Sequence, residues 1–248
     1  EEKAPDVAMY DDLTNLLNRQ AIHEHALAEL ARARIYFAIG VPFESAWLER
    51  IAAANPQMAV VHTDAGIEKI PMKPHANHDQ GTHHNHGILD PHIWLSPPLV
   101  KIQAYTILSA LQQADPSHAA VYETNYHEFV SRIHKLDEQL KAVFAGKHGL
   151  RFLVFHPAWG YFAQTYGIRQ VPIEIEGKAP KPARLEALIQ HARENHIKVI
   201  FVQPQFSTKS AELVAKEIGG QLTFADPLAE DWMANLREIA DKFEAALK

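Results

Sequence analysis

The sequence predicts an α/β protein with two doubly wound parallel-sheet lobes joined by a long rigid helix. Short apolar runs alternate with helical patterns in both halves, which is the order expected of parallel sheets. Near the middle, one helical pattern covers residues 115–146, and at 1.5 Å per residue it would measure roughly 45 Å, more than one small lobe. We therefore expect an N-terminal lobe over residues 1–114 and a C-terminal lobe over residues 147–248.

The elements of the first half follow from periodicity and from the residues that end them. Gly40 closes a short apolar run, and the pair Asn55 and Pro56 stops a helical pattern. The expected order is helix 13–34, strand 35–39, helix 43–54 and strand 58–61. This strand–helix–strand spacing predicts two parallel strands.

The second half repeats the same alternation after the long helix. Asp115 and Pro116 are suited to start that helix, with aspartate as N-cap and proline in the first turn. A helix over residues 98–111 is expected before the long helix. After it, strands are expected over residues 151–155, 169–173, 198–202 and 221–225, and helices over residues 159–166, 182–196, 208–218 and 231–246.

Composition excludes several classes of function. The formal net charge of −6 argues against nucleic acid as the main partner, because phosphate binding needs a basic surface. No apolar run approaches the roughly 18 residues of a membrane span, so we expect no membrane insertion, and no signal-peptide pattern opens the sequence, so we expect any signal to have been removed. With no cysteine and 16 histidines, any transition metal would be held by imidazole and carboxylate.

Histidines crowd one polar segment that has no apolar periodicity. This His-rich loop covers residues 75–86 and is followed by residues 90–97, in which one histidine, His92, stands among prolines and a tryptophan. Neutral imidazole binds borderline transition metals near physiological pH. The order suggests auxiliary metal binding in the loop and fixed binding at His92. The loop histidines are His75, His78, His83, His84 and His86.

Two further polar residues follow predicted strands of the second half. His156 and Asp226 each come directly after an apolar run, and a proline follows each of them. Ligands gather beyond the carboxyl ends of parallel strands, so these side chains and His92 could form a tetrahedral zinc site with a fourth ligand. The alternatives are a structural histidine at a strand end and an Asp226 that only forms a turn or caps the next helix.

Several segments together resemble the zinc-binding solute-binding proteins of bacterial ABC transporters, the ZnuA-like group. Any one of these segments is weak evidence, but together, in the family's order, they are specific. They are residues 39–44, 47–48, 75–86, 90–97, 154–162, 175–178, 203–207 and 226–228.

The resemblance implies a periplasmic or lipid-anchored, monomeric binding protein that is not an enzyme and that delivers Zn²⁺ to the membrane permease of an ABC transporter. It implies that His92 and His156 are metal ligands and that Asp226 is the carboxylate position. Manganese-binding relatives tend to carry a carboxylate where His156 stands, and imidazole in its place favours zinc. The alternatives are another divalent metal or, in a different class, a zinc hydrolase, for which no His-Glu-x-x-His motif is present.

The N-terminus departs from the family pattern. The family opens with a buried strand and a segment that supplies its first histidine ligand, and residues 1–26 match neither. Only His23 and His25 occur near the expected place, so one of them substitutes, or the segment is missing or rebuilt.

Overall fold

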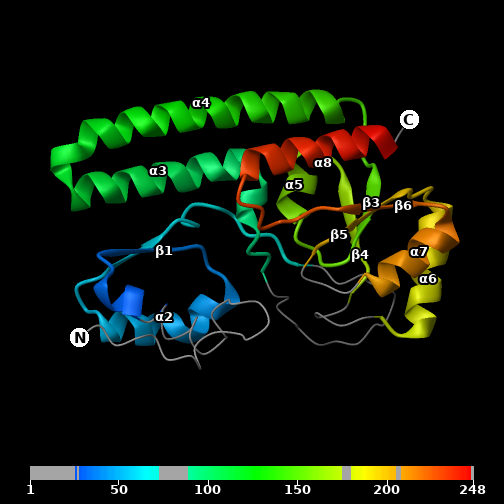
Figure 1. The fold of residues 1–248 in the computed structure, drawn as a ribbon, viewed down its shortest axis with the longest axis horizontal. Coiled ribbons are helices and arrows are strands. Elements are labelled where there is room, and N and C mark those ends of the chain that lie inside the picture. The colour runs from blue at the N-terminus through cyan, green and yellow to red at the C-terminus, as the bar shows by residue number, and fades with distance from the viewer. Residues whose placement is uncertain (1–25, 27, 73–88, 175–179, 205–207, 247–248) are drawn as a thin grey trace, which may run out of the picture. The chain divides into compact units, whose positions relative to one another are not determined.

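The computed structural model describes residue 26 and residues 28–72, 89–174, 180–204 and 208–246 (Figure 1). Its backbone divides into two compact units, residues 1–65 and residues 66–248. Each unit contains a parallel sheet, and the second also contains the long helix. The α/β class, the parallel sheets and the long helix predicted from the sequence are confirmed.

The first unit contains one strand–helix–strand motif. Its elements are β1 (Ile35–Ala38), α2 (Pro42–Ala54) and β2 (Ala59–His62), and the two strands are parallel with Ile35 opposite Ala59. The buried carboxylate of Glu44 accepts hydrogen bonds from the backbone N–H groups of residues 39 to 41 and from the hydroxyl of Tyr36. This one side chain fixes the turn that leads from β1 into α2, because it satisfies three successive backbone donors of that turn.

The second unit begins with the segment that carries His92 and ends with a helix that packs on the main core. Its helical elements are η2 (Ile93–Leu95), α3 (Pro97–Ala114), η3 (Pro116–His118), α4 (Ala119–Phe144), α5 (Gly160–Thr165), α6 (Pro182–Glu194), α7 (Lys209–Ile218) and α8 (Trp232–Ala246). Its strands are β3 (Arg151–Val154), β4 (Arg169–Pro172), β5 (Val199–Val202) and β6 (Gln221–Phe224).

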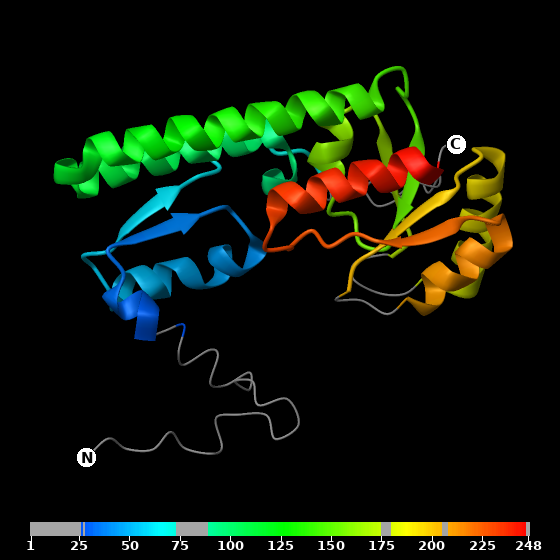
Figure 2. The same cartoon turned by 45° about the horizontal axis from the view of Figure 1, so that its top comes forward.

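The four strands form one parallel sheet in the order β4–β3–β5–β6, covered by helices on both faces (Figure 2). Successive strand residues point to opposite faces, so Phe152 and Val154 pack with α4, α5 and α8, whereas Leu153 and Phe155 pack with α6 and α7. Buried aromatic rings pack against one another in the first of these cores. The ring centroids of Phe243, on α8, and Phe152 are 4.9 Å apart. This sheet is doubly wound, as predicted.

Helix α4 runs antiparallel to α3, to which a tight corner connects it (Figure 1). The corner differs from the prediction, because the carboxylate of Asp115 does not cap the helix backbone. It accepts hydrogen bonds from the hydroxyls of Ser117 and Tyr122, and these lower the pKa of Asp115 to about 2. The first turn, Pro116–His118, is a 3₁₀ turn and not α-helix. Among the described helices, none is long and apolar enough to cross a membrane.

Candidate metal centre

His156 lies where the sheet changes its direction of growth. The chain moves from β3 outward to β4, then returns to β5 on the other side of β3, so the connections after β3 and β5 leave in opposite directions. His156 follows β3, and Gln203 follows β5. In open parallel sheets such a switch point is the usual place for a ligand.

Two glutamine side chains hold the backbone at and after His156. The amide of Gln203, which is 1% exposed, accepts from the backbone N–H of His156 at 3.1 Å and donates to its carbonyl at 2.8 Å. The amide of Gln170, next to β3 on β4, accepts from the backbone N–H of Trp159 and donates to the carbonyl of Pro157. The turn after β3 is therefore held by side chains of both neighbouring strands, in addition to the restriction that Pro157 imposes.

A buried carboxylate orients the ring of His156. The Nδ1 atom lies 2.6 Å from Oε1 of Glu174, whose side chain is 4% exposed, while the histidine side chain is 25% exposed. An ionised carboxylate accepts hydrogen bonds and cannot donate them. Nδ1 is therefore the donor of this pair, and Nε2 carries the lone pair of the ring. The second oxygen, Oε2, is buried without a hydrogen-bond partner in the described part of the chain.

The ring of His92 is also oriented by a buried carboxylate, which comes from a residue close to it in the sequence. Oδ1 of Asp90 accepts from the backbone N–H of His92 at 2.9 Å and lies 2.7 Å from its Nδ1. The side chain of Asp90 is 1% exposed and that of His92 is 12% exposed. A carboxylate behind Nδ1 fixes the tautomer and ring orientation that a metal-binding Nε2 requires.

Asp90 is itself held against the start of α5. Tyr161 donates its hydroxyl hydrogen to the carbonyl of Asp90 at 2.8 Å, and the backbone N–H of Asp90 donates to the carbonyl of Ile70. A Cβ atom placed on Gly160 would come within 2.5 Å of Oδ2 of Asp90. Only glycine at this position admits the carboxylate so close to the helix N-terminus, where a negative charge is favoured.

The two histidines come together, although they lie far apart in the sequence. The ring centroids of His92 and His156 are 5.4 Å apart, and the rings are inclined by 72°. Each ring has its Nδ1 directed to a buried carboxylate, and imidazole nitrogen is a donor atom that borderline cations accept.

Asp226 follows β6, and its local structure is that of a turn. Its Oδ1 accepts from the backbone N–H of Leu228 at 2.9 Å, and its carbonyl accepts from the side-chain amide of Asn235 at 2.7 Å. Helix α8 begins later, with Asp231 accepting from the backbone N–H of Ala234. Within the described ranges, no three or more His, Asp or Glu side chains are grouped so as to hold a metal ion. Asp226 as a ligand stays a prediction.

The remaining predicted site residues lie outside the described residues. These are His23 and His25 at the N-terminus and the five loop histidines His75, His78, His83, His84 and His86.

Asp90, Glu174, Gln170 and Gln203 were missed as functional residues by reasoning from the sequence. Two of them left a signal that could have been used. Asp90 precedes His92 by two residues, and Glu174 follows β4, which pairs with β3, the strand that precedes His156.

The model of the family described as ZnuA, zinc-uptake complex component A, periplasmic, matches residues 20–246. The chain belongs to this family. Among solved structures, the crystal structure of a ZnuA is 38% identical with a TM-score of 0.81, and the match covers 97% of this chain and 88% of that one. A ZnuA deletion mutant with zinc bound is 39% identical with a TM-score of 0.78, over 96% of this chain and 85% of that one.

Curated relatives are similar over shorter stretches. The high-affinity zinc uptake system protein ZnuA of Bacillus subtilis is 34% identical over 135 residues, which are 54% of this chain and 42% of that protein. The zinc-binding protein AdcA of Streptococcus pyogenes is 30% identical over 69% of this chain and 33% of that protein. The iron-binding protein YfeA of Yersinia pestis is 31% identical over 71% of this chain and 55% of that protein. The matches thus span 33% to 55% of the length of these relatives.

Proposed function

We propose that this protein is the Zn²⁺-binding component of an ABC transporter, which captures the ion in the periplasm and delivers it to a membrane permease. Membership of the ZnuA family supports this, as do relatives whose names state zinc binding or zinc uptake. The ion is the cargo of such a protein, so the centre must bind and also release it. The protein acts as a monomeric binding protein and not as an enzyme.

The observation that carries the proposal is the pair of imidazoles at the switch point of the sheet, each with a buried carboxylate behind its Nδ1. Two nitrogen ligands suit zinc better than the harder manganese, which prefers oxygen. The iron-binding name of one relative shows that family membership does not by itself name the metal. The donor atoms of this chain are therefore the stronger argument for zinc.

We propose His92 and His156 as the first two ligands and Asp226 as the third. The fourth is His23 or His25, and the histidines of residues 75–86 bind zinc weakly and raise its local concentration. The division into lobes 1–114 and 147–248 with a connecting helix 115–146 belongs to the same proposal.

Zinc stoichiometry and affinity, measured by competition with a chromogenic chelator, test this function. We compare the intact protein, a variant that lacks residues 75–86, and His156→Ala. The proposal predicts that the loop deletion removes only weak sites, whereas His156→Ala abolishes the tight site. A tight site that is lost with the loop and survives His156→Ala would show that the loop is the binding site.

Competition between metals tests the choice of zinc. With two imidazole ligands, Zn²⁺ should displace Mn²⁺ from the tight site at equal concentrations. Tighter binding of Mn²⁺ would contradict the proposal that zinc is the cargo, although a metal-transport role would remain.

A further inference from the structure

Trp94 lies between the two parts of the chain that carry His92 and Asp226. Its ring is inclined at 57° to that of His92, with the centroids 5.1 Å apart. Its Nε1–H donates to the carbonyl of Pro227 at 2.8 Å, the residue directly after Asp226. One indole therefore touches the His92 ring and bonds the turn that contains Asp226.

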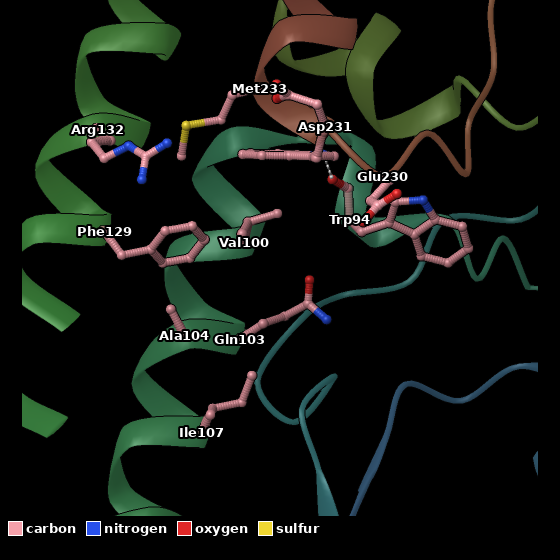
Figure 3. A pocket seen from close by; sticks show the side chains of 11 residues that line it. Trp94, Val100, Gln103, Ala104, Ile107, Phe129, Arg132, Glu230, Asp231 and Met233 are labelled. Carbon is pink, nitrogen blue, oxygen red and sulfur yellow. Dashed lines mark hydrogen bonds between the residues drawn. The ribbon is translucent and has the colours of Figure 1, made fainter. Parts of the chain in front are cut away.

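A second indole, that of Trp232, connects Trp94 to helix α8. Nε1–H of Trp232, at the start of α8, donates to the carbonyl of Trp94 at 2.7 Å, as the dashed line in Figure 3 shows. The side-chain amide of Asn235, on the same helix, donates to the carbonyl of Asp226 at 2.7 Å. The turn is thus bonded at two successive carbonyls, one by Trp94 and one by α8.

Trp94 packs against the main core, and its hydrogen bond to Pro227 adds a fixed direction to that packing. Trp94 is only partly buried and lines a cavity of about 410 Å³, together with Val100, Gln103 and Trp232 (Figure 3). Packing against the core limits where the side chain can lie, and a directional bond selects one orientation of its ring. The bond to Pro227 is such a bond.

We propose that Trp94 is a positioning residue, which holds the Asp226 turn in register with the His92 segment so that one metal ion reaches both side chains. This inference rests on the proposed zinc binding, and it identifies what places the third ligand. Trp94 binds no metal in this account, and it acts through Asp226. Its effect on zinc affinity must therefore depend on the presence of the Asp226 carboxylate.

A double-mutant cycle on the full chain tests this dependence, with Zn²⁺ affinity as the readout. Trp94→Phe keeps an aromatic ring and removes the donor. We expect it to weaken zinc binding about tenfold, as loss of an outer partner of a metal ligand commonly does. In the Asp226→Ala background the same change should alter affinity less than about twofold, because its route of action is already gone. An affinity within about twofold of the intact protein, or an equal loss in both backgrounds, would overturn the proposal.

Two further variants separate this role from stability and from the function itself. Tyr166→Phe removes a hydrogen bond to the buried Asp137, so it should lower the melting temperature and leave zinc affinity unchanged. If Trp94→Phe fails to fold, Trp232→Phe takes its place in the cycle, since it removes the bond to the Trp94 carbonyl. An intact protein without a tight zinc site would instead refute the proposed function, whatever the cycle shows.

Discussion

His92 and His156 are each held by what we call a mount, the buried carboxylate behind Nδ1 together with the backbone contacts around the histidine. The two mounts orient their rings in the same way but are built from different parts of the fold. The carboxylate behind His92 belongs to Asp90, two residues earlier, and it bonds both the backbone and the ring of that histidine. The carboxylate behind His156 belongs to Glu174, eighteen residues later, and reaches it because β3 and β4 pair in parallel. One mount is local, and the other depends on the sheet. Substitutions in the two mounts are therefore expected to change zinc affinity and stability in different ways.

Loss of either imidazole should have the largest effect on zinc affinity, and the effect should be equal for the two histidines. His92→Ala and His156→Ala each remove one nitrogen ligand. Zinc affinity should therefore fall by more than roughly 100-fold, which is the largest loss usual when a hydrogen-bond partner of a metal ligand is removed. Chelator competition measures both. A tight site that survives either change would break the comparison, because that histidine would then be structural. Exposed His127, which is 69% exposed on α4, provides the control His127→Ala, with unchanged affinity expected.

Removal of the carboxylate charge should distinguish the mounts. Asp90→Asn and Glu174→Gln should each weaken zinc binding by about 10- to 100-fold, because the imidazole loses its oriented partner. Asp90→Asn should also lower the melting temperature more, since among the described residues Asp90 accepts two side-chain hydrogen bonds and Glu174 accepts one. Nitrogen chemical shifts of the two imidazoles report the tautomers directly.

Glu138→Gln serves as the control for this pair, because Glu138 is an exposed carboxylate on α4 that pairs with Lys141. Its affinity for zinc should equal that of the intact protein. If Asp90→Asn and Glu174→Gln behave like this control, the carboxylates have no part in metal binding.

Gly160→Ala tests the local mount by sterics alone. The added Cβ meets Oδ2 of Asp90, so the carboxylate must shift, and we expect zinc affinity to fall by about three- to tenfold, less than the 10- to 100-fold range for removal of an outer partner. Gly220→Ala is the matched control, since its Cβ would meet the carbonyl of Lys198 at 2.9 Å. It should lower stability without a change in affinity. Equal affinities for the two variants would mean that Asp90 tolerates the shift.

Tyr161→Phe should have the smallest effect. Its hydroxyl donates to the carbonyl of Asp90 and accepts from the backbone N–H of Ile70, so its loss should cost roughly 1–3 kcal/mol of unfolding free energy. Urea unfolding measures this cost. Zinc affinity should change less than about threefold, well below the range for direct partners of the ligands. A larger loss of affinity would show that the position of the Asp90 backbone matters as much as its carboxylate.

Periodicity predicted most of the fold, because the elements carry strong local signals. The strand predicted over residues 198–202 and its neighbours are apolar runs bounded by breakers, and the structure places β5 at Val199–Val202. The corner at Asp115 was mispredicted at the level of hydrogen bonds, since Ser117 and Tyr122 compete with the helix backbone for the same carboxylate. Side-chain competition of this kind leaves no periodic signal.

The site was predicted only in part. His92 and His156 stood out because each lies in a motif with proline, and the structure brings them together. Glu174 directly follows a predicted strand and Gln203 opens a segment of the family resemblance, but the contact of each with His156 arises from the strand order β4–β3–β5, which a single sequence does not state. Local partners such as Asp90 can be read from spacing, whereas partners across a sheet require its topology.

A crystal structure of the zinc-loaded protein, with anomalous diffraction at the zinc edge, tests the central claim most directly. The account predicts one zinc ion with Nε2 of His92 and Nε2 of His156 at about 2.0–2.1 Å, while each Nδ1 remains bonded to Asp90 or Glu174. Zinc bound to an Nδ1 atom, or located away from this pair of histidines, would contradict it.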